Sequence, residues 1–437
     1  MKPVVCIVGR PNVGKSTLFN RIVGKRVSIT EDIPGVTRDR IYAEAEWLNK
    51  YFLLIDTGGI EPFSEDEILS HIRKQAEVAI DTADVILFVV DGLSGITSTD
   101  VEIANMLRKS NKDVLLVCNK IDTQKTPDII YEFYELGLGD PIVVSAEQSL
   151  GLGDLLDEVI EKFPHEKATE YDDDIIKVAV IGKPNAGKSS LINNILGEDR
   201  VIVSNIPGTT RDAIDTYFEL EDKKYLFIDT AGIRRKRSIS ESIERYSVIR
   251  SYTAIERSDI CILIIDAKEG ATEQDARIAG LAHEQGKGLI IAINKWDLVD
   301  KVTNTYREFE KKTRDILSFV TYAPIIFISA KTGKRVNRIL DLIGEIYNNY
   351  TMRIKTGILN DIINEAVILN QPPTDKGRRL KIYYGTQVGI RPPKFVIFIN
   401  DKKLLHFSYI RYLENQIRQQ FGFEGTPIQI EFNEKGD

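Results

Sequence analysis

One nine-residue pattern occurs twice in this sequence, as GRPNVGKST at residues 9–17 and as GKPNAGKSS at residues 182–190. Four further segments follow each copy in the same order: PGVTRD and PGTTRD, DTGG and DTAG, NKID and NKWD, and finally SAE and SAK. A fixed order of matches with small drifts in spacing indicates a duplicated domain rather than chance similarity. We therefore expect two domains of one kind in this chain.

Each copy alternates apolar runs with stretches of helical periodicity. The first copy contains VVCIVG, YFLLIDTGG, VILFVVDG and DVLLVCNK, and the second contains IKVAVIG, KYLFIDTAG, ICILIIDA and GLIIAINK. Such near-continuous apolar runs are typical of parallel strands buried on both faces. Helical patterns at 66–81 and 98–109 lie between the runs of the first copy. The sequence predicts an α/β fold for each copy, with a mostly parallel sheet and helices on both faces.

Changes in composition predict the domain plan. We expect a first repeated domain at 1–163, an exposed acidic linker at 164–174, a second repeated domain at 175–349 and a small α+β domain at 350–437. The last domain has the predicted order α-β-β-α-β, with Ser408 as the N-cap of its second helix. Tyr383 and Tyr384 are neighbours on a predicted strand, so one of them should lie in the core.

Charge is distributed unevenly along the chain. The net charge is −7, yet residues 350–437 hold thirteen Lys and Arg against nine Asp and Glu. A basic domain on an acidic body favours a nucleic-acid or ribonucleoprotein partner, although charge alone favours an ordinary solvated surface. No window holds eighteen apolar residues, and MKPVVCIVGR predicts a buried strand instead of a signal peptide.

The three cysteines indicate the compartment. Cys6, Cys118 and Cys261 all lie in short apolar runs, so we expect buried core residues and neither disulfides nor metal ligands. A protein without disulfides is typical of a reducing environment, and we expect a cytoplasmic location.

The repeated glycine-rich segments have the residues that bind phosphate. Each should join a strand to a helix, with glycines that let backbone N–H groups curl around phosphate oxygens at the N-terminus of the helix. Lys15 and Lys188 would place a charge on the β- and γ-phosphates. The hydroxyls of Ser16 and Ser189 would bind Mg²⁺.

The segments NKID and NKWD predict which base is bound. Asp122 and Asp297 can each accept hydrogen bonds from guanine N1–H and from its exocyclic amine, whereas adenine offers neither donor there. Asn119 and Asn294 would brace the loop and contact the base. Backbone groups of SAE and SAK would complete the pocket, so GTP and GDP are the predicted ligands.

Further contacts are expected around the γ-phosphate. Threonines in mobile-looking segments could close on Mg²⁺ while the γ-phosphate is present and release it after hydrolysis. Aspartates at strand ends would hold Mg²⁺ through water, and glycines would donate a backbone N–H to the γ-phosphate. These residues are Thr37, Asp56 and Gly59 in the first copy and Thr210, Asp229 and Gly232 in the second.

Both copies contain the five ordered motifs of translation-factor-like GTPases. Their tandem arrangement, followed by a small α+β domain, closely resembles the bacterial Der family, also called EngA, over essentially the whole chain. The resemblance implies two P-loop GTPase domains and a KH-like C-terminal domain. It also implies a GTPase that acts in assembly or stability of the large ribosomal subunit. The expected partners are the large ribosomal subunit or its precursor, and ribosomal RNA. We expect a monomer that binds neither DNA nor membranes.

One catalytic residue of small signalling GTPases is missing. Ile60 and Ile233 occupy the position of the glutamine that orients the attacking water, and an aliphatic side chain cannot do so by hydrogen bonding. The resemblance implies that a potassium ion near the β- and γ-phosphates, partly bound by Asn12 and Asn185, stabilises the developing charge. Support of a turn is the alternative role of these asparagines.

The two copies also differ. Glu147 occupies the position of Lys331, whose stem could pack on the guanine plane, so the first site should bind less tightly. The basic run IRRKR follows Gly232 and is either a solvated loop or a contact to RNA or an acidic partner in one nucleotide state.

The C-terminal domain has two open roles, which are compatible with each other: it could bind ribosomal RNA, or dock on a GTPase domain and sense its state. GFEG at 422–425 follows the last helix and carries an acidic residue, so we interpret it as a turn and not as the RNA-gripping loop of KH domains. A basic surface is expected from Lys376, Arg378, Arg379, Lys381, Arg391 and Lys394.

Two other classes of function remain. One is a GTP-dependent scaffold in a membrane or in cell division; neither an amphipathic basic helix nor a lipidation motif is evident in the sequence, which speaks against it. A metabolic enzyme with GTP as phosphoryl donor would need an acceptor site, for which no constellation of His, Cys or paired carboxylates is evident.

The predicted catalytic residues are Lys15, Thr37, Lys188 and Thr210. The predicted nucleotide-binding residues are Gly9, Arg10, Pro11, Asn12, Val13, Gly14, Lys15, Ser16, Thr17, Asp56, Thr57, Gly58, Gly59, Ile60, Asn119, Lys120, Ile121, Asp122, Ser145, Ala146, Gly182, Lys183, Pro184, Asn185, Ala186, Gly187, Lys188, Ser189, Ser190, Asp229, Thr230, Ala231, Gly232, Ile233, Asn294, Lys295, Trp296, Asp297, Ser329, Ala330 and Lys331. The predicted Mg²⁺ ligands are Ser16, Thr37, Asp56, Ser189, Thr210 and Asp229, and the predicted K⁺ ligands are Asn12 and Asn185.

Overall fold

The computed structural model describes residues 2–24, 42–57, 76–77, 79–80, 82–123, 127–164, 174–197, 202–203, 215–220, 223–228, 244–300, 304–372, 374–375 and 378–434. Among these, residues up to 164 form one compact unit and residues from 174 onward form another. The predicted linker at 164–174, apart from its two end residues, and most of the helical pattern at 66–81 lie outside the described residues. No helix in the described ranges is both long and apolar enough to span a bilayer.

The first unit is built on a six-stranded sheet in the order β2-β3-β1-β4-β5-β6. The strands are Val4–Val8 (β1), Tyr42–Trp47 (β2), Lys50–Asp56 (β3), Val85–Asp91 (β4), Asp113–Asn119 (β5) and Ile142–Val143 (β6). The β2–β3 pair is antiparallel, and the other pairs are parallel.

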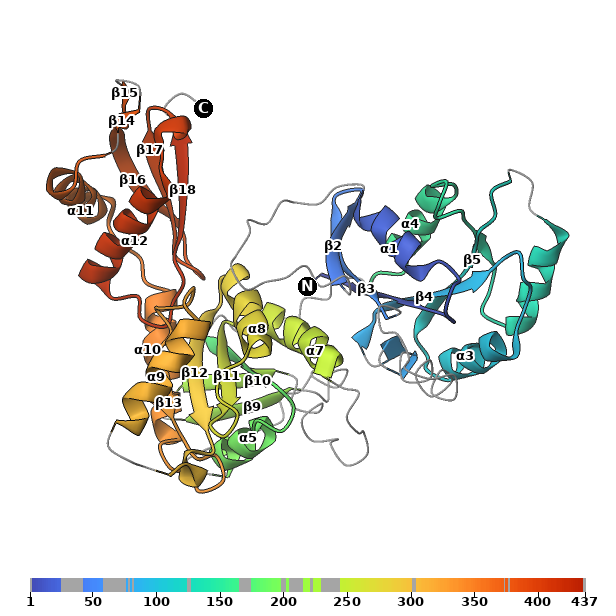
Figure 1. Cartoon of the computed structure of the whole chain (residues 1–437), viewed down its shortest axis with the longest axis horizontal. Helices are drawn as coiled ribbons and strands as arrows, with labels where there is room; N and C mark the ends of the chain where they lie inside the picture. Colours follow the sequence, from blue (N-terminus) through green and yellow to red (C-terminus); the bar gives the residue numbers. More distant parts are fainter. Residues whose placement is uncertain are drawn as a thin grey trace. The chain divides into compact units, whose positions relative to one another are not determined.

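Helices cover both faces of this sheet. They are Lys15–Val23 (α1), Ser98–Arg108 (α3) and Leu152–Glu161 (α4), with a 3₁₀ segment at Asp128–Leu136 (η2). Helices α1 and α4 lie on one side of the sheet and α3 lies on the other (Figure 1). Strands β1 and β4 are therefore buried along their whole length, which is why the sequence shows unbroken apolar runs there. The predicted helix at 98–109 and the α/β fold are confirmed.

The second unit contains a seven-stranded sheet in the order β13-β12-β11-β7-β10-β9-β8. The strands are Ile175–Ile181 (β7), Ile202–Val203 (β8), Thr216–Leu220 (β9), Lys223–Ile228 (β10), Ile260–Asp266 (β11), Gly288–Asn294 (β12) and Ile325–Phe327 (β13). The pairs β8–β9 and β9–β10 are antiparallel and the others are parallel, so the central order of the first sheet is repeated.

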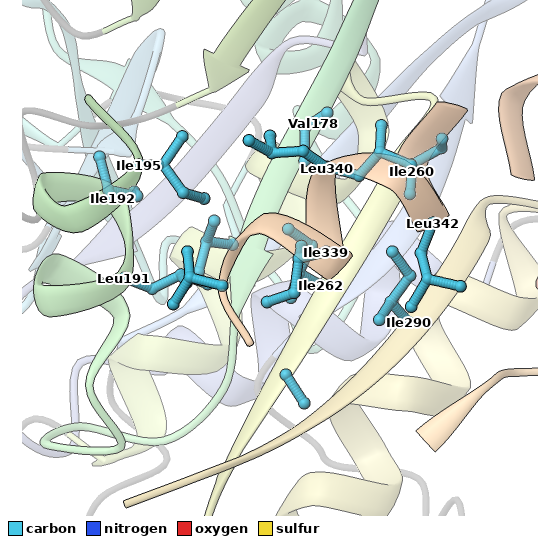
Figure 2. Close-up of a cluster of buried hydrophobic side chains, with 14 of the residues drawn as sticks. Val178, Leu191, Ile192, Ile195, Ile260, Ile262, Ile290, Ile339, Leu340 and Leu342 are labelled. Atoms are coloured by element: carbon cyan, nitrogen blue, oxygen red, sulfur yellow. The ribbon is translucent and has the colours of Figure 1, made fainter. Parts of the chain in front are cut away.

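The helices of the second sheet are Lys188–Leu196 (α5), Glu244–Arg257 (α7), Glu273–Glu284 (α8), Thr305–Ile316 (α9) and Asn337–Tyr350 (α10), with a 3₁₀ turn at Trp296–Leu298 (η3). One face of the sheet is covered by α5 and α10. Figure 2 shows the core formed there by Leu191, Ile192, Ile195, Ile339, Leu340 and Leu342 of these helices and by Val178, Ile260, Ile262 and Ile290 of the strands.

The C-terminal part of the second unit has its own core. Its elements are Thr356–Leu369 (α11), Thr374–Asp375 (β14), Arg378–Arg379 (β15), Ile382–Gly389 (β16), Lys394–Ile399 (β17), Lys402–Leu404 (η4), Phe407–Phe421 (α12) and Gln429–Glu434 (β18). Strand β17 lies between β16, which is antiparallel to it, and β18, which is parallel. The predicted order α-β-β-α-β is confirmed, with a short β14–β15 hairpin in addition.

Two predictions for this domain are wrong. Helix α12 begins one residue before Ser408, and its N-cap is His406, whose ring nitrogen accepts from the Ser408 N–H. Tyr383 and Tyr384 are each 44% exposed. The register shifts between Ile382 and Tyr384, so strict alternation of side chains fails there and neither tyrosine enters the core.

The segment GFEG forms a turn that docks on the second sheet. The carbonyl of Gly425 accepts from the Leu289 N–H in β12 at 2.8 Å, and its N–H donates to the Tyr322 carbonyl at 2.7 Å. Gly425 has φ +70°, and a Cβ there would lie 2.3 Å from Ile346 of α10. A residue without a side chain is therefore required. The structure thus shows the docking on the second repeated domain that was expected for the C-terminal domain; sensing of the nucleotide state stays a prediction.

Candidate functional site

The predicted site segments gather at one edge of each sheet, where the parallel strands end. Residues 9–17 connect β1 to α1, residues 119–122 follow β5, and residues 145–146 follow β6. In the second copy, the corresponding segments connect β7 to α5 and follow β12 and β13. Ligands of open α/β sheets bind at this edge, and each sheet brings its segments together there.

Some predicted site residues lie outside the described parts of the chain. They are Thr37, Gly58, Gly59, Ile60, Thr210, Asp229, Thr230, Ala231, Gly232 and Ile233, together with the basic run 234–237 and Lys376.

Both glycine-rich loops approach a neighbouring strand too closely for a side chain. A Cβ on Gly9 would lie 2.2 Å from the Val89 carbonyl oxygen, and a Cβ on Gly182 would lie 2.4 Å from that of Ile264. Gly9 also has φ +157° and Gly182 φ +134°. The loops therefore need glycine for packing as well as for backbone conformation.

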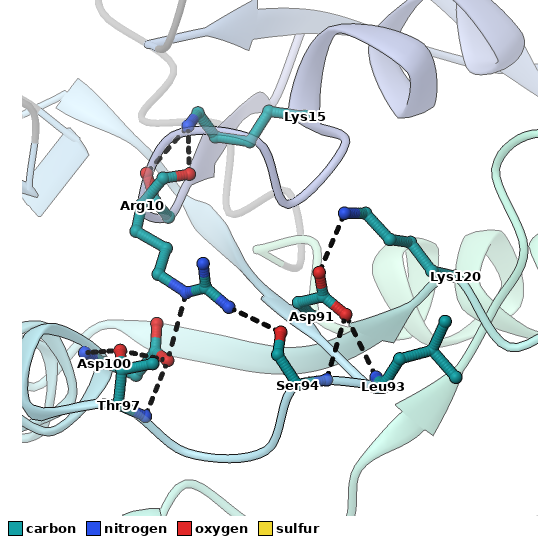
Figure 3. A network of polar contacts seen from close by, with 9 residues as sticks. Arg10, Lys15, Asp91, Leu93, Ser94, Thr97, Asp100 and Lys120 are labelled. Carbon is teal, nitrogen blue, oxygen red and sulfur yellow. Dashed lines mark hydrogen bonds and ion pairs between the residues drawn. The ribbon is translucent and has the colours of Figure 1, made fainter.

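Each loop lysine folds back onto its own loop. Lys15 Nζ donates to the carbonyl oxygens of Gly9 and Arg10, both at 2.8 Å (Figure 3). In the second copy, Lys188 Nζ donates to the equivalent carbonyls at 2.5 and 2.6 Å. Burial lowers the pKa of the Lys15 ammonium to about 8, although the nearby Asp56 carboxylate opposes this shift. A phosphate oxygen could replace the carbonyls as partner of this cation.

Two of the predicted Mg²⁺ ligands meet in the first copy. The Ser16 hydroxyl at the start of α1 donates to Asp56 Oδ2 at the end of β3, at 2.7 Å. Asp56 is 1% exposed. Hydroxyl and carboxylate oxygens are the donors that Mg²⁺ prefers, so this pair fits a magnesium ion.

A buried asparagine ties the phosphate loop to the base loop in each copy. Asn119 Nδ2 donates to the Val13 carbonyl at 2.8 Å, and its Oδ1 accepts from the Ala146 N–H at 2.9 Å. Asn294 makes the same two bonds, both at 2.8 Å, to the carbonyl of Ala186 and the N–H of Ala330. One amide group thus fixes the distance between the two halves of each site.

The base loop of the first copy orients its aspartate. The buried Ser145 hydroxyl donates to Asp122 Oδ1 at 2.5 Å, which leaves Oδ2 for other donors. Both NKxD lysines have positive φ and pair with a carboxylate at the end of the preceding strand: Lys120 with Asp91 at 2.8 Å, and Lys295 with Asp266 at 2.5 Å.

Asp91 and Asp266, the two strand-end aspartates, were not predicted from the sequence to be site residues. Burial would raise the pKa of Asp91, but hydrogen bonds from Lys120 and from the Leu93 N–H outweigh it, so the pKa lies below its ordinary value. The signal for both was present: VVDG and IIDA each end an apolar strand with a carboxylate.

The two base loops are supported differently. In the first copy, Arg21 of α1 donates to the carbonyls of Ala146 at 3.1 Å and Glu147 at 2.7 Å. In the second copy, Trp296 packs edge-on against Phe309 and Phe327, with ring centroids 5.2 and 4.4 Å apart. The copies share the asparagine bonds and the lysine–aspartate pair, and they differ in the residues that support the base loop from behind.

Comparisons with known proteins agree with this geometry. A family described as 50S ribosome-binding GTPase matches residues 4–120 and 177–295, and a family described as the KH-domain-like C-terminal domain of EngA bacterial GTPase enzymes matches residues 353–433. The GTPase Der of Alkaliphilus metalliredigens is 62% identical over 434 residues, with 99% of both chains covered. The chain belongs to the Der family of GTPases.

Other Der proteins agree equally well. Those of Alkaliphilus oremlandii and Acetivibrio thermocellus are each 61% identical, with 99% of both chains covered. The recognised family, the tandem P-loop GTPase fold and the KH-like domain are thereby confirmed. As a Der GTPase, the protein binds GTP and hydrolyses it to GDP and phosphate.

We predict that Ser145→Ala weakens GDP binding at the first site about tenfold or more. The substitution removes a hydrogen bond to a charged acceptor, and such bonds contribute about 1.5–3 kcal/mol. Calorimetric titration of a chain whose second site is disabled by Asp297→Asn would measure the effect.

Ser98→Ala is the matched control because Ser98 is exposed on α3. Equal GDP affinity of Ser145→Ala and the control would show that this hydroxyl does not orient Asp122.

Proposed function

We propose that the protein is a GTP-dependent switch that acts in the cytoplasm, as a monomer, in assembly or stability of the large ribosomal subunit. This proposal is supported by the presence of two candidate nucleotide sites in one chain. It is also supported by the basic C-terminal domain, which docks on the second repeated domain. The family description as 50S ribosome-binding supports the choice of partner. Two sites permit four combinations of bound nucleotide, so one chain can combine two inputs.

In this proposal each site works with the residues predicted from the sequence. Loop amides and the N-terminus of the following helix surround the phosphates, and Lys15 or Lys188 moves from its loop carbonyls to phosphate oxygens. When bound, Mg²⁺ would neutralise charge on the phosphates, and Ser16 and Asp56 would hold it in the first copy. Thr37 and Thr210 close on it in the GTP state. Asp122 and Asp297 select guanine.

The RNA-binding surface is proposed for the exposed side chains of Arg379 and Lys381. Other basic residues of the predicted surface have partners within the protein. Arg391 donates to the Tyr347 hydroxyl at 2.6 Å, and Lys394 pairs with Glu431 at 2.5 Å. These two residues contribute less to binding of an external phosphate.

We predict that ribosomal subunits retain the protein differently in its different nucleotide states. The GTP form should co-sediment with large subunits and the GDP form should not, because closed switch segments present a different surface. The measurement is pelleting with purified subunits in the presence of a non-hydrolysable GTP analogue or GDP, with small subunits as control. Equal binding in every state would contradict the proposed switch.

We also propose that potassium assists hydrolysis beside Asn12 and Asn185. Both asparagines have a left-handed backbone conformation, with φ 65° at Asn12 and 62° at Asn185, and they occupy equivalent positions in their loops. Turnover should be faster in potassium than in sodium salts at equal ionic strength. Asn12→Gly and Asn185→Gly keep a residue that tolerates this backbone but lose the amide oxygen, so they should abolish the difference at their sites. Equal rates in both salts would remove the proposal.

A further inference from the structure

The second residue of each phosphate loop is held by a buried carboxylate from a distant helix. Arg10 Nε lies 3.4 Å from Asp100 Oδ2, and Lys183 Nζ lies 3.8 Å from Asp275 Oδ2. Both carboxylates are fully buried. Figure 3 shows the first of these pairs, with Arg10 extending from the loop toward the start of α3. The same contact is thus built twice, once with arginine and once with lysine.

Each carboxylate is fixed by its own helix. Asp100 Oδ2 accepts from the N–H and the hydroxyl of Thr97, at 3.1 and 2.7 Å, at the N-terminus of α3. Asp275 accepts from the same groups of Thr272 at 3.0 and 2.8 Å, at the N-terminus of α8. These are capping boxes, which stabilise a helix without any need for burial. The other oxygen of each carboxylate is buried without a hydrogen bond, a cost that capping does not explain.

The residue that each carboxylate holds also carries the loop lysine. The Arg10 carbonyl accepts from Lys15 Nζ, and the Lys183 carbonyl accepts from Lys188 Nζ. A second contact anchors the same side chains: Arg10 donates to the Ser94 hydroxyl at 2.9 Å, and Lys183 donates to Glu269 at 2.6 Å. A continuous path of contacts therefore runs from the capping box to the ammonium group of each site.

We propose that Asp100 and Asp275 are positioning residues for the two phosphate loops. Each carboxylate holds the second loop residue in place and thereby fixes the carbonyl on which the phosphate-binding lysine rests. The lysine then stays within reach of the β- and γ-phosphates, and the loop amides keep their curled arrangement. This inference rests on the proposed roles of Lys15 and Lys188 and adds a residue pair outside the known nucleotide motifs.

Asp275→Asn tests the proposal in the full chain, with the first site disabled by Asp122→Asn. Asparagine keeps the shape and an oxygen for the capping box but loses the charge that holds Lys183. GDP and a non-hydrolysable GTP analogue should bind at least tenfold more weakly, whereas GMP, which lacks the phosphates that the lysine contacts, should bind within twofold of the parent. Glu273→Gln is the matched control, because it removes an exposed charge from the same helical turn and should change neither affinity.

Two further variants separate positioning from capping. Lys183→Met leaves the capping box intact and should reproduce the selective loss of GDP affinity, whereas Lys183→Arg, which introduces the cation used at Arg10, should bind GDP more tightly than Lys183→Met does. Combined, Asp275→Asn and Lys183→Met should cost less GDP affinity than the sum of the two single losses, because both remove the contact between Lys183 and Asp275.

The proposal is overturned if Lys183→Met leaves GDP affinity unchanged, or if Asp275→Asn weakens GDP and GMP equally. Because no ribosome is involved, either result leaves the ribosomal role standing. A parent chain that binds no GDP at its second site would instead overturn both the inference and the proposed function.

Discussion

Both sites depend on a single buried amide. The side-chain oxygen of Asn119 and of Asn294 accepts a hydrogen bond from the base loop, and the side-chain nitrogen donates one to the phosphate loop. Each of the two residues is 2% exposed. A side chain at Gly14 would lie 2.3 Å from the first of these amides, and one at Gly187 would lie 2.0 Å from the second. The glycine of the loop and the asparagine of the base motif therefore fit each other, which explains why two motifs about a hundred residues apart in sequence occur together.

The duplicated domains keep this arrangement and vary its supports. Arg10 and Lys183 reach equivalent carboxylates with different cations, and Arg21 and Trp296 stabilise the two base loops by hydrogen bonds and by aromatic packing respectively. The two bonds of the buried asparagine and the two bonds of the loop lysine are made in both copies. The difference in support gives the two sites a physical basis for different affinities, in addition to the substitution of Glu147 for lysine.

The sequence predicted the sheets well because their central strands are buried on both faces, so VVCIVG and ICILIIDA are apolar throughout. It predicted the phosphate and base loops because their chemistry needs fixed residue types at short spacing. It failed where long-range geometry decides. A register shift next to Tyr384 breaks the alternation of side chains that was expected on that strand. In the sequence Asp100 resembles an ordinary helix-capping residue, and only the fold shows that it lies against Arg10, ninety positions earlier in the chain. Docking of Gly425 on β12 likewise has no local signal.

Equilibrium dialysis of the nucleotide-free protein tests the central claim, that each of the two sites selects guanine through its own aspartate. The chain should bind two equivalents of labelled GDP, a large excess of ADP should displace neither, and Asp122→Asn or Asp297→Asn should each lower the number to one. Saturation at a single GDP in the parent chain, or displacement by ADP as effective as displacement by unlabelled GDP, would contradict the account.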